Sequence, residues 1–321
     1  SISTPLVVIA AVVYVLSWPV RGVRYRAILA AMRAQVHLPT AIAAIFISQL
    51  GNLVVPARAG DLLRAYVLRR VAHLPYPVGV ASLAAERIFD LLSLGVLAGV
   101  VVLGFAVTGE ATVLGGVIGG ASGAGAVAVG VAMVVLAVVV AVMVALVVSK
   151  RLQRRLRQHA LQWAAADLYR RRIADVVLGM LVDLQRVTTS PGRVAVVGGA
   201  SLVVWLIDVV TAVLVLEAFG VPVRGGWLVV VGTLAVSVGN LAKVLPLSPG
   251  GIGLYEGAFT LLIVGLTPIA AATALAAAIV DHALKNVVTI VGGAGSFGAL
   301  NLSVRRTFAE SRELAEDGVA E

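Results

Sequence analysis

Long apolar runs alternate with short basic stretches along the chain. Runs of about 20 residues, the length that crosses the hydrocarbon core of a bilayer, recur at 2–20, 78–108, 126–148, 194–219 and 269–298. Strict apolar–polar alternation is missing and Ala, Leu and Val come in runs, which argues against an outer-membrane barrel. The pattern therefore predicts an all-α, polytopic membrane protein.

Two further apolar stretches are interrupted by proline and glycine. Residues 38–55 run through Pro56 into 57–70, a piece of 14 residues with five charges that cannot cross lipid alone. Residues 227–245 lead into "KVLPLSPGGIGLYEGAF" at 243–259. A helix break at membrane depth is tolerated only where the freed backbone groups meet protein or water. We therefore expect two re-entrant broken-helix hairpins; the alternative is that each stretch makes two full spans.

The two halves of the chain carry the same features in the same order. Trp18 precedes a Gly-Asn-Leu motif at 51–53, and Trp205 precedes the same motif at 239–241. Each motif is followed by a Pro/Gly break, a short amphipathic piece and an Ala-rich helix with internal charges. This order predicts a single domain of two repeats. The first covers about 1–108, the second about 194–300, with a connecting span and basic segment at 109–193 and a polar tail at 301–321.

Charge sets the expected orientation. The chain is 60% hydrophobic and 13% charged, with a net charge of +9 carried in clusters between apolar runs. Such clusters indicate topology and anionic lipid headgroups rather than nucleic acid. The basic segment 150–172 and the C-terminus are predicted to be cytoplasmic, in the inner or plasma membrane of the cell. The two repeats then come out inverted, with hairpins that meet near the midplane, as in secondary transporters.

The second break is typical of an anion site. Ser248 is a natural N-cap residue, and a helix that starts there would point free N–H groups at the break. Gly250 and Gly251 allow a ligand to approach closely, and Lys243 adds a cation, which suits a phosphate. The alternative is a tight turn beside a lysine that reaches for the interface.

Ionisable residues elsewhere in the apolar runs are the other candidates. Asp61 and Arg64 can pair on one helix and leave Arg58 for a phosphate, unless these arginines are ordinary cytoplasmic charge. Glu256 could partner Arg87 or Lys243. Charges at membrane depth are expensive and usually functional, but they can also pair and simply lock helices together. The predicted substrate-binding residues are Asn52, Arg58, Asp61, Arg64, Glu86, Arg87, Asp90, Asn240, Lys243, Ser248, Gly250, Gly251, Glu256, Asp281, His282 and Lys285.

Several kinds of site are not expected. The chain has no cysteine, and no spacing of His and carboxylates suggests a metal, so we predict neither a metal nor another cofactor. A nucleophile–base pair is not visible, so we predict no catalytic residue and a protein that is not an enzyme.

Three motifs together resemble a known family. They are P-x-x-x-G-[DE]-x-x-R at 56–64, E-R-x-x-D at 86–90 and P-G-G-x-G-x-x-E at 249–256. The chain is similar over nearly its whole length to the lysylphosphatidylglycerol synthase transmembrane, flippase-like family, which includes the membrane half of multiple peptide resistance factor. The resemblance implies movement of a lipid between leaflets, often an aminoacylated phospholipid or a polyprenyl-linked sugar.

The leading hypothesis is therefore a lipid flippase or scramblase. Its substrate would be an anionic or aminoacylated phospholipid or a polyprenyl-phosphate-linked lipid. The first alternative is a membrane transferase that acts on a lipid phosphate. The second is a non-transporting membrane partner of a separately encoded lipid-modifying synthase. Membrane lipids are the expected partners, and oligomers of the chain are compatible with the sequence.

Overall fold

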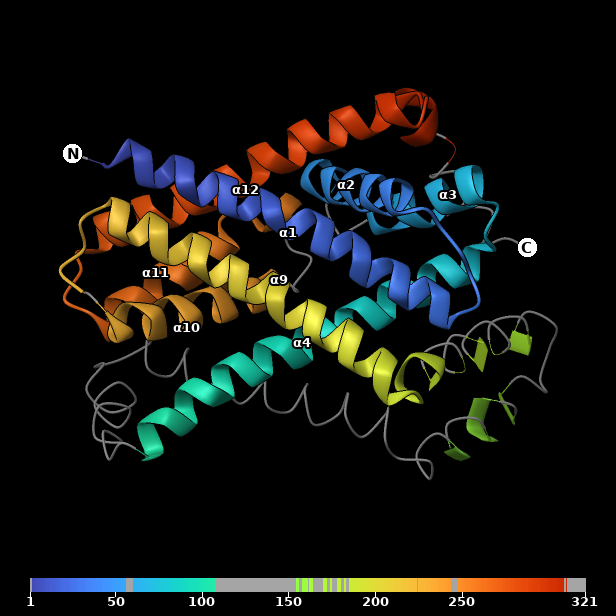
Figure 1. The fold of residues 1–321 in the computed structure, drawn as a ribbon, viewed down its shortest axis with the longest axis horizontal. Helices are drawn as coiled ribbons and strands as arrows, with labels where there is room; N and C mark the ends of the chain where they lie inside the picture. Colours follow the sequence, from blue (N-terminus) through green and yellow to red (C-terminus); the bar gives the residue numbers. More distant parts are fainter. Residues whose placement is uncertain are drawn as a thin grey trace.

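The computed structural model describes residues 2–55, 60–107, 185–223, 225–243, 248–308 and 310, with isolated positions between 154 and 182. The predicted span 126–148, Arg58 and most of the basic segment 150–172 lie outside the described residues. Every regular element in the described ranges is a helix (Figure 1). The main elements are α1 (Thr4–Ala31), α2 (Leu38–Val54), α3 (Gly60–Ala72), α4 (Tyr76–Val107), α9 (Pro191–Ala218), α10 (Gly226–Ala242), the 3₁₀ turn η2 (Pro249–Gly251), α11 (Leu254–Leu266) and α12 (Ala271–Ala299).

The distribution of polar residues is that of a membrane protein. Four described helical stretches are long and apolar enough to cross a bilayer: Thr4–Ala31, Pro191–Ala218, Pro249–Leu266 and Ala271–Ala299. Large apolar side chains such as Val8, Val12 and Leu16 are exposed, whereas Arg24 and Asp281 are fully buried. Lipid is the natural surrounding for such an apolar exterior. The prediction of an all-α polytopic membrane protein is confirmed.

The first helix is longer than predicted. The apolar run ends near residue 20, but α1 continues through Pro19 to Ala31. Arg21, Arg24 and Arg26 therefore lie within the helix. These arginines lie on different faces of the helix, because Arg24 is buried while Arg26 is exposed. One arginine of this basic stretch, Arg24, thus points into the protein interior.

The two halves match in the lengths of their helices. Helices α1 to α4 have 28, 17, 13 and 32 residues, and α9 to α12 have 28, 17, 13 and 29. The equivalent helices α1 and α9 pack side by side and run in opposite directions (Figure 1). The backbone N–H of Ser3, just before α1, donates to the carbonyl of Ala218 at the end of α9, 2.9 Å away. Antiparallel packing of these two helices is what an inverted repeat requires; the repeat and its orientation in the membrane stay predictions.

The halves are interlocked through their hairpins. Helix α12 packs on α2, and α4 packs on α10 in the same way. Gly293 of α12 lies against Leu50 of α2 so closely that an added Cβ would come within 2.8 Å of the leucine side chain. The two breaks also meet, because η2 packs on α2 and an added Cβ at Gly250 would lie 2.6 Å from Leu53 Cδ1. The end of α2 in the first hairpin and η2 in the second hairpin therefore lie next to each other.

Candidate functional site

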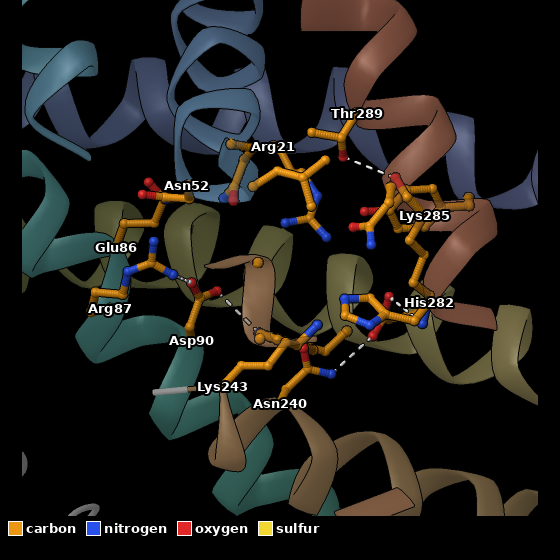
Figure 2. Close-up of a pocket in the computed structure, with 18 of the residues that line it drawn as sticks. Arg21, Asn52, Glu86, Arg87, Asp90, Asn240, Lys243, His282, Lys285 and Thr289 are labelled. Atoms are coloured by element: carbon orange, nitrogen blue, oxygen red, sulfur yellow. Dashed lines mark hydrogen bonds and ion pairs between the residues drawn. The ribbon is translucent and has the colours of Figure 1, made fainter. Parts of the chain in front are cut away.

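A cavity of about 240 Å³ lies where the two breaks meet (Figure 2). Helices α1, α2, α4, α9, α10 and α12 all contribute to its wall. Ligand pockets for drug-sized molecules are typically about 300–1,000 Å³, so this cavity suits a smaller ligand or chemical group. The predicted residues that line it are Asn52, Glu86, Arg87, Asp90, Asn240, Lys243, Ser248, Gly250, Gly251, His282 and Lys285.

The second break starts its helix later than predicted. Ser248 makes no side-chain cap, and Pro249 begins only a 3₁₀ turn. Gly250, Gly251 and Gly253 have φ values of 61°, 77° and 84°, which interrupt helical geometry, so α11 begins at Leu254. Glu256 then caps α11 from within, because its Oε2 accepts a hydrogen bond of 2.7 Å from the Gly253 N–H. The free helix end that the sequence suggested at Ser248 is therefore not formed there.

A first ionic cluster, made of Arg24, Arg64, Glu86 and Asp90, joins α1, α3 and α4. Glu86 forms ion pairs with both Arg24 and Arg64, and the Arg24 Nη1 lies 2.5 Å from Asp90 Oδ1. Both arginine side chains are fully buried. Two side chains of α9 complete it: Trp205 Nε1 donates to Asp90 Oδ1 at 3.0 Å, and Ser201 Oγ accepts a hydrogen bond from Arg24 at 3.2 Å. A buried charge is tolerated only when paired in this way.

Asp61 pairs with Arg87 beside this cluster and is linked to it, because Arg87 Nη1 also lies 3.8 Å from Asp90 Oδ2. It accepts hydrogen bonds from Ser48 Oγ at 3.1 Å and Asn52 Nδ2 at 2.8 Å, and the Arg87 Nη2 lies 3.3 Å from its Oδ2. The structure thus pairs Asp61 with α4 and Arg64 with Glu86, instead of joining Asp61 to Arg64 along α3. Asp61 and Arg64 of the first hairpin are therefore both paired with residues of α4. Arg87, at 29% exposure of its side chain, faces the cavity.

A second ionic cluster, made of Asp208, Glu256, Asp281, His282 and Lys285, occupies the other half. Lys285 Nζ lies 3.0 Å from Asp208 Oδ1 and 2.8 Å from Asp281 Oδ2. His282 Nδ1 lies 2.6 Å from Glu256 Oε1. The partner of Glu256 is thus His282, and not Arg87 or Lys243 as the sequence suggested.

Neighbouring polar side chains hold the second cluster in place. Tyr255 donates its hydroxyl to Asp281 at 2.7 Å, and Asn240 donates to Asp208 at 3.2 Å. The Lys243 Nζ lies 4.3 Å from the centre of the Tyr255 ring, which is a cation–π distance. The described part of the chain gathers no three His, Asp or Glu side chains in a way that could hold a metal ion.

Sequence reasoning missed three charged residues of the site: Arg21, Arg24 and Asp208. Arg21 and Asp208 line the cavity, and Arg24 lies at the centre of the first ionic cluster. A signal was present, because Arg21 follows Trp18 by three residues and Asp208 follows Trp205 by three. Extending the repeat comparison from the tryptophans would have found this pair. Arg24 had no such signal, since its burial depends on how α1 is turned.

Two curated relatives are similar to the chain. A Haloferax volcanii protein named Glycosyltransferase AglD is 48% identical over 320 residues, 97% of this chain and 51% of that protein. A Methanothermobacter thermautotrophicus protein named UPF0104 membrane protein is 28% identical over 283 residues, 84% of this chain and 76% of that protein. The chain thus spans about half the length of the first relative. No solved structure matches the chain.

The first relative corrects one prediction. The expectation that the chain is not an enzyme is wrong, because a relative with 48% identity across nearly the whole chain is named a glycosyltransferase. The absence of a visible nucleophile–base pair was a weak argument, since glycosyl transfer can proceed by binding and orientation of two substrates. A lipid-related function in the membrane, the coarser form of the leading hypothesis, stands.

The family itself is shown by the sequence. The profile described as Lysylphosphatidylglycerol synthase TM region matches residues 1–293, which include both hairpins and the three motifs that carried the resemblance. The multi-pass helical fold agrees with a transmembrane region. The chain therefore belongs to the lysylphosphatidylglycerol synthase transmembrane region family.

Proposed function

We propose that this chain acts in glycosyl transfer at the membrane and that its cavity binds the phosphate end of a lipid carrier. The observation that carries the proposal is a charged cavity enclosed where two helix breaks meet, inside a protein whose exterior is apolar. The similarity to a glycosyltransferase over 97% of the chain supports transfer of a sugar as the reaction. The family name supports a lipid as one reactant.

The geometry suits a lipid phosphate. Arg21, Arg87, Lys243 and Lys285 line the cavity and offer cationic donors to phosphate oxygens. The ion pairs behind them fix the positions of Arg87 and Lys285 before a ligand arrives, so less ordering is left to the binding step. The lipid chains would stay along the apolar outer faces of the helices.

The reaction assigns the lipid the role of acceptor. An oxygen of the lipid phosphate forms a bond to the anomeric carbon of a nucleotide-activated sugar. The bond from that carbon to the nucleotide phosphate breaks, and its electron pair leaves with the nucleotide. The residues of this chain would hold the lipid phosphate in position, which raises its effective concentration at the sugar.

A two-step experiment tests the proposal. The chain is placed in nanodiscs, and binding of polyprenyl phosphate and of the phosphate-free polyprenol is compared by native mass spectrometry. We expect only the phosphate to bind, and Lys243→Gln to weaken it about tenfold, as for a charge-assisted hydrogen bond. Membranes that contain the chain are then given a labelled nucleotide sugar and polyprenyl phosphate, and labelled lipid is measured.

The control for both steps is Arg26→Gln, an exposed arginine of α1 away from the cavity. Equal binding of polyprenol and polyprenyl phosphate would contradict the site. Labelled lipid that does not depend on the chain or on Lys243 would contradict the reaction.

Transport of a lipid-linked sugar is a second candidate. It is favoured by the antiparallel α1 and α9 and by the two breaks that end at one cavity, the plan by which transporters give alternating access to a central site. In proteoliposomes, transport would change the leaflet of a labelled lipid and leave its mass unchanged. Transfer changes the mass, so mass spectrometry of the recovered lipid separates the two.

A further inference from the structure

One histidine of the chain is buried on the wall of the cavity. The side chain of His282, on α12, is 3% exposed and lines the cavity, whereas His37, His73 and His159 are exposed. Imidazole is the side chain that ordinarily gains or loses its charge between pH 5 and pH 8. A buried imidazole among charged residues is therefore a candidate binding site for a proton.

The contact with Glu256 fixes which ring nitrogen of His282 carries hydrogen in the neutral form. Glu256 Oε1 lies 2.6 Å from His282 Nδ1, and its Oε2 accepts the N–H of Gly253 at 2.7 Å. An ionised carboxylate only accepts hydrogen bonds, so Nδ1 is the donor. The neutral ring then has its lone pair on Nε2.

The Nε2 atom is the one that can take up a further proton. It makes no hydrogen bond with any residue that the structure describes, and Figure 2 shows the His282 ring pointing into the cavity. Protonation would turn Nε2 from an acceptor into a donor. The cavity would thus gain an N–H group and a positive charge at the same atom.

Charges of opposite sign act on this proton. Glu256 favours the protonated ring of His282, whereas Lys243 and Lys285 oppose it. All three nitrogen-bearing groups gather around Tyr255. The centre of its ring lies 4.9 Å from the imidazole centre, 4.3 Å from Lys243 Nζ and 5.6 Å from Lys285 Nζ. An anion bound beside the two lysines would offset their charges and so favour protonation.

The other elements around the cavity contribute further charged or titratable groups. Helix α2 and the turn η2 contain none. Those of α1, α4, α9 and α12 that line the cavity or pair with its lining residues are Tyr14, Arg21, Arg24, Glu86, Arg87, Asp90, Asp208 and Asp281.

The charges of the site balance while His282 is neutral. Over the described residues of the cavity wall, the two ionic clusters and Asp61, six cations face six carboxylates. They are Arg21, Arg24, Arg64, Arg87, Lys243 and Lys285, and Asp61, Glu86, Asp90, Asp208, Glu256 and Asp281. An anionic ligand adds negative charge to this balanced set, where the protein interior screens it poorly. One proton on His282 would offset one unit of that charge.

We infer that His282 is a proton site linked to anion binding. When an anionic ligand enters the cavity, the lone pair of Nε2 takes up one proton from solvent, and the new N–H donates to the ligand. Glu256 holds the ring in the required tautomer and stabilises its charged form. The inference rests on the proposed function and adds a regulation to the same site: the anion is bound more tightly as the pH falls and released as it rises.

The test follows the affinity of the chain in nanodiscs for polyprenyl phosphate by native mass spectrometry from pH 8 to pH 5, the range in which imidazole changes its charge. The slope of log Kd against pH counts the protons taken up on binding. The phosphate of the ligand also titrates in this range. Each wild-type affinity is therefore divided by that of His282→Gln at the same pH, and this ratio should rise about tenfold from pH 8 to pH 5, as for one charge-assisted hydrogen bond.

The variants are chosen to keep the local contacts. In His282→Gln an amide N–H can still donate to Glu256, but the side chain cannot be protonated. Glu256→Gln removes the carboxylate that stabilises the charged ring, so the gain in affinity at low pH should shrink to about threefold. His37→Gln is the control. The same change is made there at an exposed histidine that makes no side-chain cap on α2, and its affinity should follow wild type at every pH.

Failure of this inference can be told from failure of the proposed function. If polyprenyl phosphate binds but the ratio of wild type to His282→Gln is the same at every pH, the inference is overturned and the proposed function stands. A ratio that falls as the pH drops also overturns it. If wild type binds no polyprenyl phosphate at any pH, both fail. Melting temperatures of each variant across the pH range establish that a change in affinity is not unfolding.

Discussion

In each half of the molecule an ionic cluster joins the first helix to the fourth, but the helix that carries the positive charge differs between the halves. In the first half, a cation on the first helix, Arg24, meets acids on the fourth, α4. In the second half the acid lies on the first helix, as Asp208 of α9, and the cation Lys285 lies on the fourth, α12. The two halves therefore have a charge pair between the same two helices, but the positive and the negative residue have exchanged helices.

A contact between the third and the fourth helix is also found in both halves, and here the acid lies on the third helix each time. Asp61 of α3 meets Arg87 of α4, and Glu256 of α11 meets His282 of α12; the partners are 26 residues apart in both cases. The first half uses arginines, two of them fully buried, and the second uses lysine and histidine. Arginine keeps its charge at any ordinary pH, whereas histidine is charged only when protonated, so the first cluster is the better suited to locking helices.

The largest expected effect is on the first cluster. Glu86→Gln removes the carboxylate that pairs both Arg24 and Arg64, and leaves buried arginine charge uncompensated. The free energy of unfolding should fall by about 3–5 kcal/mol, measured by denaturant unfolding in detergent micelles. Glu217→Gln, the same change at an exposed position of α9, is the control and should be neutral. A loss below about 1 kcal/mol would show that the first cluster is not a lock.

The start of α3 lies directly against the backbone of α2. A Cβ on Gly60, at the start of α3, would collide with the backbone of Ser48, Gly51 and Asn52. Gly60→Ala should therefore cost about 1–3 kcal/mol in the same unfolding measurement, the usual range for overpacking. Gly257→Ala in α11 is the matched control, because nothing lies within 4 Å of its added Cβ. Equal losses at both positions would mean that the close contact between Gly60 and α2 is not the cause of the loss.

Much of the cavity could be predicted from the sequence, because breaks and charges inside apolar runs are visible as pattern. Glu86, Arg87 and Asp90 on one side and His282 and Lys285 on the other do line it. The pairings could not be predicted. Glu86 reaches Arg24 across 62 residues, and that contact depends on the rotation and crossing of α1 and α4. Spacing along one helix reports only neighbours such as Asp281 and Lys285.

A double-mutant cycle measures how strongly the second cluster is coupled. Asp208→Asn and Lys285→Gln each remove one partner of the 3.0 Å pair. In Asp208→Asn the lysine keeps its contact with Asp281, and in Lys285→Gln the carboxylate of Asp208 keeps its hydrogen bond from Asn240. We expect a coupling energy of about 1–2 kcal/mol in the unfolding measurement. Asp208→Asn combined with Glu217→Gln should be additive and serves as the reference. A coupling energy of zero would mean that Lys285 is held by Asp281 alone.

The smallest effects on stability, and the sharpest contrast between the halves, concern Asp61 and Glu256. Both side chains are partly exposed, so Asp61→Asn and Glu256→Gln should each change the free energy of unfolding by less than about 1 kcal/mol. Their effects on binding should differ. Asp61→Asn removes a carboxylate that faces Arg87, a permanent cation on the cavity wall, so affinity for polyprenyl phosphate should rise about threefold.

Glu256→Gln leaves Gly253 an amide oxygen to donate to, and it removes a charge only from beside His282, whose ring carries a full charge only when protonated. Affinity for polyprenyl phosphate at pH 8 should therefore stay within a factor of about two of wild type, because an unperturbed imidazole is neutral there. Native mass spectrometry on the same nanodiscs measures both variants. Equal gains would mean that histidine and arginine play the same electrostatic part, and that the two halves differ in sequence but not in function at this position.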